Sequence, residues 1–362
     1  MPKTPKRRIV VKIGTGVLTS GVGCLETDKM KSLCRQVAQA KSRGVDVILV
    51  SSGAVGLGMG KLGFKSRPKN IRKAQLCAAV GQGTLIQTWA ELFAPFSITV
   101  AQILLMRDDV DSLTRYNSVR ELIDEALKNG VVPILNENDC ISAAEMNMKF
   151  GDNDVLSALV STLAKADDLV ILSTASGLLD MHGTGETVKI IKSITPEIKA
   201  MAGGTSSATA VGGMVTKIKA AEIATRNGCN VFIARGDAPN VLIDILDGKN
   251  PGSEFLAKSN PSGARKRWLA YFGKTIQKIT VDGGAAKALR DTGGSLLPAG
   301  VLAVSGDFSK GEMVEIVDSS TGAPVARGLA EVDSAELAKM RSHKGKCAHK
   351  YVVVHRDNMA LV

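Results

Sequence analysis

The sequence of 362 residues has few aromatic residues, few histidines and only scattered cysteines. Phe, Trp and Tyr together make up 4% of it, which argues against the base-stacking grooves that bind single-stranded nucleic acid. The six cysteines form no CxxC pair and the four histidines form no HExxH motif, so these sequence signatures of zinc sites are excluded. Scattered cysteines are typical of free thiols in a reducing compartment.

Long apolar runs and targeting signals are also missing. No segment approaches the ~20 apolar residues of a membrane helix. The basic segment MPKTPKRR leads into the apolar run Ile9–Ile13, which is too short for a signal-peptide core and contains Lys12. We therefore expect a cytoplasmic protein that does not contact a membrane. The P-loop pattern GxxxxGK[ST] is absent too, which excludes that mode of phosphate binding.

Acidic residues are too few to balance the basic ones, since 46 Lys and Arg face 35 Asp and Glu, a net charge of +11. Such an excess indicates an anionic partner. Residues 275–362 carry only +1 of it, so nearly all of the excess lies in the first 274 residues. Between Asp46 and Glu91 there is no acid, and the role of the bases there is open between a solvated loop and an anion-binding loop. These bases are Lys61, Lys65, Arg67, Lys69, Arg72 and Lys73.

The first 262 residues alternate short apolar runs with segments of helical spacing. Arg8–Ile13 and Val45–Val50 are β-branched and predict strands, and between them Met30, Leu33 and Val37 recur at helical spacing. The alternation continues through expected helices at 73–93, 116–129, 154–165, 214–227 and 241–246, and expected strands at 99–105, 131–135, 168–172 and 229–234. This order predicts an α/β fold, a three-layer αβα domain with a mainly parallel sheet over residues 1–262.

The pattern changes in the last quarter of the chain. A segment with Pro and Ser, followed by the basic triplet Arg265–Arg267, predicts a solvated linker over residues 263–274. Beyond it, a small β-rich domain is expected over residues 275–362. Its expected elements are strands at 275–281, 300–304, 313–317, 325–329 and 350–354, and a helix at 284–291.

Two lysines stand beside glycine turns. Lys12 ends the first expected strand just before Gly14, and a lysine inside an apolar strand costs desolvation unless it meets an anion. Gly212–Gly213 precedes the helix that contains Lys217, and the free N–H groups of a helix start form a ready anion site. The two lysines together predict a phosphate site.

Another glycine motif does not fit a nucleotide site. Gly58–Gly63 matches GxGxxG after an expected strand, as in dinucleotide-binding turns. Such turns need an acidic residue about 20 positions further on, to bind a ribose hydroxyl. The sequence has no acid there before Glu91, so we reject a dinucleotide site.

Polar residues follow two further expected strands. Ser51–Ala54 suits an anion-binding nest and a plain turn about equally well. Asn136–Asp139 follows strand 131–135, and Gly151–Asp154 opens the next helix, where a polar residue could also serve as its N-cap. Functional loops gather at the carboxyl ends of parallel strands. With the two lysines, these loops predict phosphoryl transfer from a nucleotide to a small substrate.

Five segments together resemble the glutamate 5-kinases of the amino-acid kinase family: VVKIGTGVLT (10–19), VSSGA (50–54), NENDCISAAE (136–145), GDNDVLSA (151–158) and GGMVTK (212–217). Three more resemble the C-terminal PUA domain of those enzymes: ITVDGGAAKAL (279–289), GGSLLPAGV (293–301) and SGDFSKGEMV (305–314). The resemblance implies phosphorylation of the L-glutamate γ-carboxylate by ATP with Mg²⁺, the first step of proline synthesis. It also implies feedback inhibition by proline and a homo-oligomer, either dimer or tetramer.

The resemblance implies roles for individual residues. Lys12 and Lys217 would be catalytic and hold the transferred phosphoryl group, and Asp154 would orient them. The residues implied for glutamate are Ser52, Gly53, Ala54, Asn136, Asp139 and Asn153. Those implied for ATP are Lys12, Gly14, Ser173, Thr174, Gly212, Gly213, Met214 and Lys217. No protein ligand for the metal is expected. Ser173–Thr174 departs from the family, which often has Thr-Asp there, and so removes a carboxylate from a nucleotide-contacting pair.

Two other functions remain open. Another kinase of the same fold would act on aspartate or N-acetylglutamate, and the PUA-like segment argues against it. An RNA-binding protein is the second alternative, because PUA domains commonly bind RNA. The net charge of only +1 over residues 275–362 weighs against RNA. Cys140 adjoins Asp139, and we interpret it as a small buried residue rather than a redox sensor.

Overall fold

The computed structural model describes residues 6–141, 153–180, 183–204, 213–258, 269, 277–342 and 351–361. They form two compact units, which we describe separately. The expected linker at 263–274 lies outside the described residues except for the buried Leu269. None of the described helices is long and apolar enough to cross a membrane.

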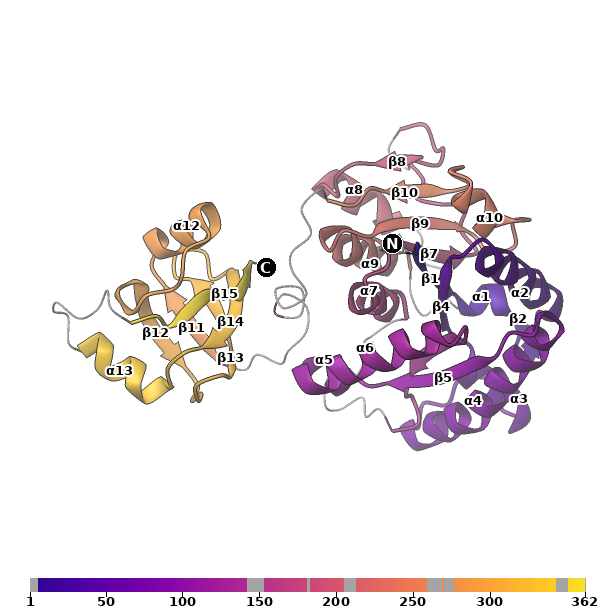
Figure 1. Ribbon diagram of the computed structural model, residues 1–362, viewed down its shortest axis with the longest axis horizontal. Coiled ribbons are helices and arrows are strands. Elements are labelled where there is room, and N and C mark those ends of the chain that lie inside the picture. Colours follow the sequence, from indigo (N-terminus) through magenta and orange to yellow (C-terminus); the bar gives the residue numbers. More distant parts are fainter. Residues whose placement is uncertain are drawn as a thin grey trace, which may run out of the picture. The chain divides into compact units, whose positions relative to one another are not determined.

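The N-terminal unit is built on an eight-stranded sheet (Figure 1). Its spatial order is β5 (Val100–Leu105), β6 (Val132–Glu137), β4 (Asp46–Ser51), β1 (Arg8–Ile13), β7 (Asp168–Ser173), β9 (Asn230–Arg235), β10 (Ser253–Phe255) and β8 (Ile190–Ile191). All neighbours are parallel except β9 and β10. The prediction of a mainly parallel sheet is confirmed. Ile13 pairs with Ser51 and Leu172, so three carboxyl strand ends meet in register.

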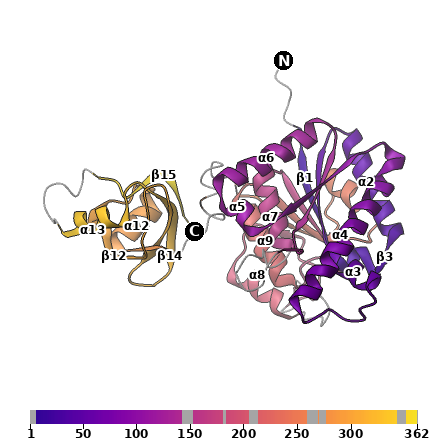
Figure 2. The ribbon, with the colours of Figure 1, turned by 90° about the horizontal axis from the view of Figure 1, so that it is seen from below.

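Helices cover both faces of this sheet, as Figure 2 shows. One face packs against α2 (Thr27–Ser42), α4 (Ile71–Phe93) and α10 (Val241–Leu246), whose apolar residues share one core with alternate residues of the central strands. The other face carries α7 (Asn153–Ala164) and α9 (Met214–Arg226), with α6 (Leu113–Lys128) on the same side. Every residue of α7 from Asp154 onward is buried, because this helix lies across the middle of the sheet. The three-layer prediction is therefore correct.

The GxGxxG segment is helical over its first four residues and ends in a turn at Gly63. Gly58 and Gly60 lie inside α3 (Ala54–Lys61), which packs along α4. A Cβ atom on Gly58 would come 1.8 Å from the carbonyl oxygen of Cys77, and one on Gly81 would come 1.8 Å from that of Ala54. These glycines allow two helix backbones to touch, which is a packing role and not a phosphate-binding one. The spacing alone did not predict this helix.

Several short elements were also not predicted from the sequence. They are the hairpin β2 (Thr19–Gly21) and β3 (Cys24–Leu25), α1 (Thr15–Leu18), α5 (Arg107–Asp111), α8 (Pro196–Ala200), and the edge strands β8 and β10. Each is five residues or shorter, so none holds enough residues to display a helical or strand period.

The C-terminal unit holds a five-stranded sheet in the order β12 (Val301–Ser305), β11 (Lys278–Val281), β13 (Met313–Asp318), β14 (Pro324–Ala330) and β15 (Val354–Leu361). Only β11 and β13 are parallel. Helices α12 (Gly283–Thr292) and α13 (Ser334–Ser342) complete it, and a separate apolar core lies within it. The expected last strand at 350–354 was wrong: β15 begins at Val354, and its middle is polar, so hydrophobicity did not reveal it.

Candidate functional site

The carboxyl ends of β1, β4 and β6 and the starts of α7 and α9 supply one cluster of polar side chains. Lys12 lies on β1, Ser52 follows β4 and Asn136 lies on β6. Asp154 stands in the first turn of α7, and Lys217 in the first turn of α9. The structure thus brings together residues that are up to 205 positions apart in the chain. Parallel strands with helical crossovers place their functional loops at this edge.

A buried carboxylate joins the two lysines. Lys12 Nζ lies 2.6 Å from Asp154 Oδ1, and Lys217 Nζ donates a hydrogen bond of 3.1 Å to Asp154 Oδ2. Asp154 is 0% exposed, Lys12 5% and Lys217 6%. Buried charges are tolerated when they are paired, and two ammonium groups on one carboxylate leave this cluster with a charge of +1. That residual positive charge suits an anion.

The ionised form of Asp154 is strongly favoured. Burial on its own raises the pKa of Asp154, but the charges of Lys12 and Lys217, with hydrogen bonds from Lys12 and Thr216, hold that pKa below its usual range. Thr216 Oγ1 lies 2.9 Å from Asp154 Oδ2 and 2.9 Å from the carbonyl of Gly213. Asp154 therefore stays a fixed negative anchor from which both ammonium groups extend.

A chain of side-chain hydrogen bonds runs beside this cluster. Asn153 Nδ2 donates to Ser52 Oγ at 2.8 Å and to Asn136 Oδ1 at 2.9 Å. Asn136 Nδ2 in turn donates to Gln82 Oε1 on α4 at 2.9 Å. Both N–H donors of the Asn153 amide are used in these bonds, which leaves its Oδ1 available as an acceptor. Ser52 Oγ accepts one of them, which leaves its hydroxyl proton available as a donor. The network offers one acceptor and one donor, as the ammonium and carboxylate of an amino acid require.

Of the remaining residues predicted to bind glutamate, Gly53 and Ala54 follow Ser52 directly in the sequence. Gly53 takes φ of +110° and leads directly into α3 at Ala54, which is buried. The left-handed backbone turns the chain sharply between strand and helix and favours glycine. Asp139 follows β6 and is half-buried, with its backbone N–H bonded to the carbonyl of Glu137.

The predicted nucleotide residues lie at β1, β7 and α9. A Cβ atom at Gly14 would lie 3.6 Å from Lys12 Nζ, so this glycine keeps the space beside the ammonium open. Ser173 ends β7, and the exposed Thr174 follows it, with its methyl group 3.0 Å from the Cβ position of Gly16. Gly213 is the N-cap of α9 without a side-chain cap, and Met214 is the first helical residue. Gly212 lies outside the described residues.

The donor set of the described residues does not fit a protein-held Mg²⁺. The described residues contain no group of three or more His, Cys, Asp or Glu side chains that could hold a metal ion. Asp154, the carboxylate at the centre of the cluster, is engaged by the lysines through both oxygens. A hard cation prefers several free oxygen ligands, which this anchor does not offer.

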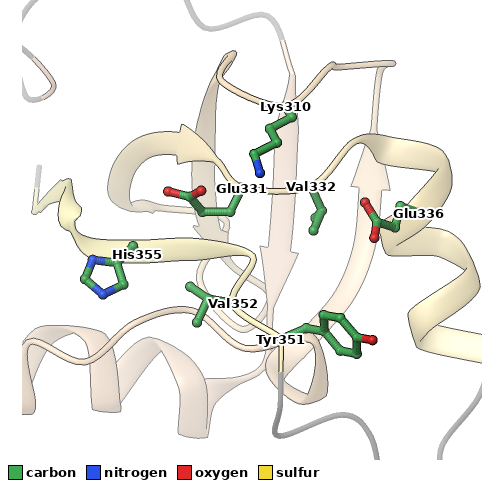
Figure 3. A pocket seen from close by; sticks show the side chains of 7 residues that line it. All are labelled: Lys310, Glu331, Val332, Glu336, Tyr351, Val352 and His355. Atoms are coloured by element: carbon green, nitrogen blue, oxygen red, sulfur yellow. The ribbon is translucent and has the colours of Figure 1, made fainter.

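A cavity of about 490 Å³ lies in the C-terminal unit (Figure 3). Among the described residues, its lining carries the carboxylates of Glu331 and Glu336 together with Lys310 and His355. Tyr351 also lines the cavity, at 47% exposure.

A parallel sheet with two buried lysines at its carboxyl edge is typical of one class of protein, the phosphotransferases. Residues 7–235 match the family model described as amino acid kinase family, and residues 277–352 match that of the PUA domain. The first match spans more than half of the chain, so the chain belongs to the amino acid kinase family.

Similar curated proteins are glutamate 5-kinases. The glutamate 5-kinase of Moorella thermoacetica is 40% identical over 367 residues, covering 98% of this chain and 96% of its own. That of Vibrio parahaemolyticus is 40% identical over 365 residues, with the same shares covered. Among solved structures, carbamate kinase from Giardia lamblia bound to AMP-PNP aligns with a TM-score of 0.50 and 19% identity. It covers 70% of this chain and 99% of its own, and at this identity supports the fold alone.

Proposed function

We propose that this protein transfers the γ-phosphoryl group of ATP to the γ-carboxylate of L-glutamate, giving L-glutamyl 5-phosphate for proline biosynthesis. The full-length similarity to glutamate 5-kinases supports this substrate. The observation that carries the chemistry is the Lys12–Asp154–Lys217 cluster, a buried and positively charged site beside a network with one free donor and one free acceptor.

Catalysis in this proposal needs no general base. The attacking group is a carboxylate oxygen, and a glutamate carboxyl with a reference pKa of ~4.3 is ionised at neutral pH. What the protein must supply is alignment and neutralisation of the charge on the transferred phosphoryl group. Lys12 and Lys217 hold the phosphoryl oxygens from two sides, and Asp154 fixes both ammonium groups so that little reorganisation is needed.

The nucleotide lies on the α9 side of the lysine pair in this proposal. The uncapped start of α9 at Gly213 and Met214 presents backbone N–H groups to phosphate oxygens. Gly14 lets the phosphates approach the backbone, and Ser173 and Thr174 contact the nucleotide from the end of β7. Gly212 extends the same contact. Mg²⁺ binds to the ATP phosphates in this proposal, and no protein ligand is assigned to it.

Glutamate lies on the α3 side. The Ser52 hydroxyl donates to a substrate carboxylate, and Asn153 Oδ1 accepts from the substrate ammonium. Gly53 and Ala54 bring backbone groups to the same place, and Asn136 and Asp139 close it. Proline, which carries the same α-amino and α-carboxylate groups, competes for this site as an inhibitor.

The proposal has further parts. The kinase domain spans residues 1–262, a linker 263–274 and the PUA-like domain 275–362, in line with the two family matches. The protein works in the cytoplasm as a homo-oligomer, a dimer or a tetramer.

An ADP-release assay with glutamate, aspartate and N-acetylglutamate tests the proposal. We expect turnover with glutamate alone, dependent on Mg²⁺ and inhibited by proline in competition with glutamate. Turnover with aspartate or N-acetylglutamate instead of glutamate would refute the assigned substrate. Inhibition by proline that glutamate cannot overcome would refute the competitive site.

A further inference from the structure

One buried side chain at this site belongs to no motif. Gln82 lies on α4, is 7% exposed, and its Oε1 accepts the 2.9 Å hydrogen bond from Asn136 Nδ2. Its own Nε2 has no hydrogen-bond partner among the described residues. We propose that Gln82 is a positioning residue for the acceptor substrate, acting through Asn136, which rests on the proposed function of this site.

The direction of the hydrogen bonds is fixed by one backbone group. The N–H of Glu137 can only donate, and it donates to the Asn136 side chain at 2.9 Å, so that atom must be Oδ1. Asn136 Nδ2 therefore points to Gln82, which must present its oxygen. The same Oδ1 then receives Asn153 Nδ2, and this leaves Asn153 Oδ1 as the free acceptor at the site.

Gln82 reinforces the Asn136 orientation that the Glu137 N–H sets, and so helps to fix which atoms the substrate meets. With its oxygen in place, a flip of the Asn136 amide would set a carbonyl against Gln82 Oε1 and an NH₂ group against two donors. Each lost or reversed bond in a buried network costs about 1–3 kcal/mol, so the observed orientation is strongly preferred. Asn153 and Ser52 depend on that orientation.

The position of Gln82 is fixed by its neighbour. Gly81 packs so closely on the first turn of α3 that a Cβ atom there would lie 1.8 Å from the Ala54 carbonyl oxygen. The stretch of α4 that carries Gln82 is thereby locked to the turn at Gly53–Ala54, the proposed glutamate loop. The side chain and the loop that it serves form one rigid body.

Steady-state kinetics of Gln82→Met test the proposal, because methionine keeps the length and burial but accepts no comparable hydrogen bond. We expect KM for the acceptor to rise about tenfold, equal to about 1.4 kcal/mol, with kcat and KM for ATP little changed. Gln87→Met is the matched control: Gln87 lies on the same helix, is exposed and bonds only to Glu91, so its KM values should not move.

A double-mutant cycle with Asn136→Ala separates positioning from a general structural effect. If Gln82 acts through Asn136, adding Gln82→Met to Asn136→Ala raises the acceptor KM no further. Additive effects, a loss in kcat alone, or an equal rise in KM for ATP would overturn the proposal. Gln82→Asn, which keeps the amide but withdraws its oxygen by one methylene, gives the same non-additive pattern and serves if Gln82→Met does not fold.

The wild-type acceptor is established first, with glutamate, aspartate and N-acetylglutamate. Lack of turnover with glutamate refutes the proposed function, and the Gln82 variants are then measured with the acceptor that does react. A normal acceptor KM in Gln82→Met, with turnover of wild-type protein on glutamate, refutes only the role of Gln82.

Discussion

Replacement of Asp154 by asparagine is the sharpest test of the lysine cluster. The substitution keeps the shape of the side chain but removes the charge that holds two buried ammonium groups, at 2.6 Å from Lys12 Nζ and 3.1 Å from Lys217 Nζ. Unit charges ~4 Å apart attract by about 4 kcal/mol at an effective dielectric constant of about 20, and both pairs are shorter than that. Desolvation offsets much of this attraction, and breaking a buried pair costs about 3–5 kcal/mol overall.

We expect Asp154→Asn to lower the free energy of unfolding by about 3–5 kcal/mol, measured by urea denaturation at pH 7. We also expect kcat to fall by about 10²–10³, the loss typical of a disrupted electrostatic site, while the protein remains folded. The control is Asp247→Asn, which breaks an exposed 2.7 Å ion pair with Arg43. Surface pairs contribute about 0–1 kcal/mol, so this variant should be nearly unchanged.

The same variant tests the titration of Asp154. Its pKa is lower in the folded protein than in the unfolded chain, so its contribution to stability is full above the unfolded value of ~3.9 and is lost as pH falls through the folded value. The difference in unfolding free energy between wild type and Asp154→Asn should therefore shrink below pH ~4. A variant with near-normal kcat and unchanged stability at pH 7 would refute the reasoning.

Three further predictions follow from single sites. Lys217→Met should lower kcat far more than it raises KM for glutamate, and equal changes in steady-state kinetics would contradict its role at the phosphoryl group. Gly81→Ala should destabilise the fold by about 1–3 kcal/mol in urea denaturation through its clash with α3, whereas Gly83→Ala on the same helix, where the Cβ meets nothing within 4 Å, should be neutral or stabilising. Burial, and to a lesser extent Asp139, raises the pKa of the Cys140 thiol. Iodoacetamide near neutral pH should therefore modify the exposed Cys24 before Cys140, as read by peptide mass, with activity retained. Labelling of Cys140 before Cys24 would contradict this.

The strands of the parallel sheet could be predicted because their apolar runs are long and rich in β-branched residues. Strand Arg8–Ile13 and helix Val241–Leu246 have the predicted bounds, and the other strands and helices predicted for the N-terminal domain agree to within a few residues. Helix α13 (Ser334–Ser342) was not predicted. Helix α3 could not be predicted, since three glycines in eight residues have low helix propensity and only contact with α4 makes them favourable. Strand β15 was missed because its middle residues are polar and give no apolar run.

At the site, the lysines and polar loops could be predicted from the sequence because each interrupts or follows an apolar strand or adjoins a glycine turn. Gln82 was missed, since a single glutamine in a helix resembles a solvated residue. A usable signal was present: Cys77, Ala78, Gly81 and Leu85 mark the buried face of α4, and Gln82 falls on it. A polar residue within a buried helical stripe needs a hydrogen-bond partner, but the sequence does not name Asn136, which is 54 positions away.

Asn153 and Asp154 are consecutive residues at the start of α7, and they serve the two halves of the site. Asn153 bonds to the network beside Ser52, and Asp154 holds the two lysines. Under the proposed function, a shift in this one turn would change the contacts to both substrates at once, so the geometry would couple their binding. An inhibitor bound at the acceptor position would then change the affinity for phosphate as well as exclude glutamate. Because thermodynamic coupling is reciprocal, bound nucleotide would change the affinity for that inhibitor by the same factor.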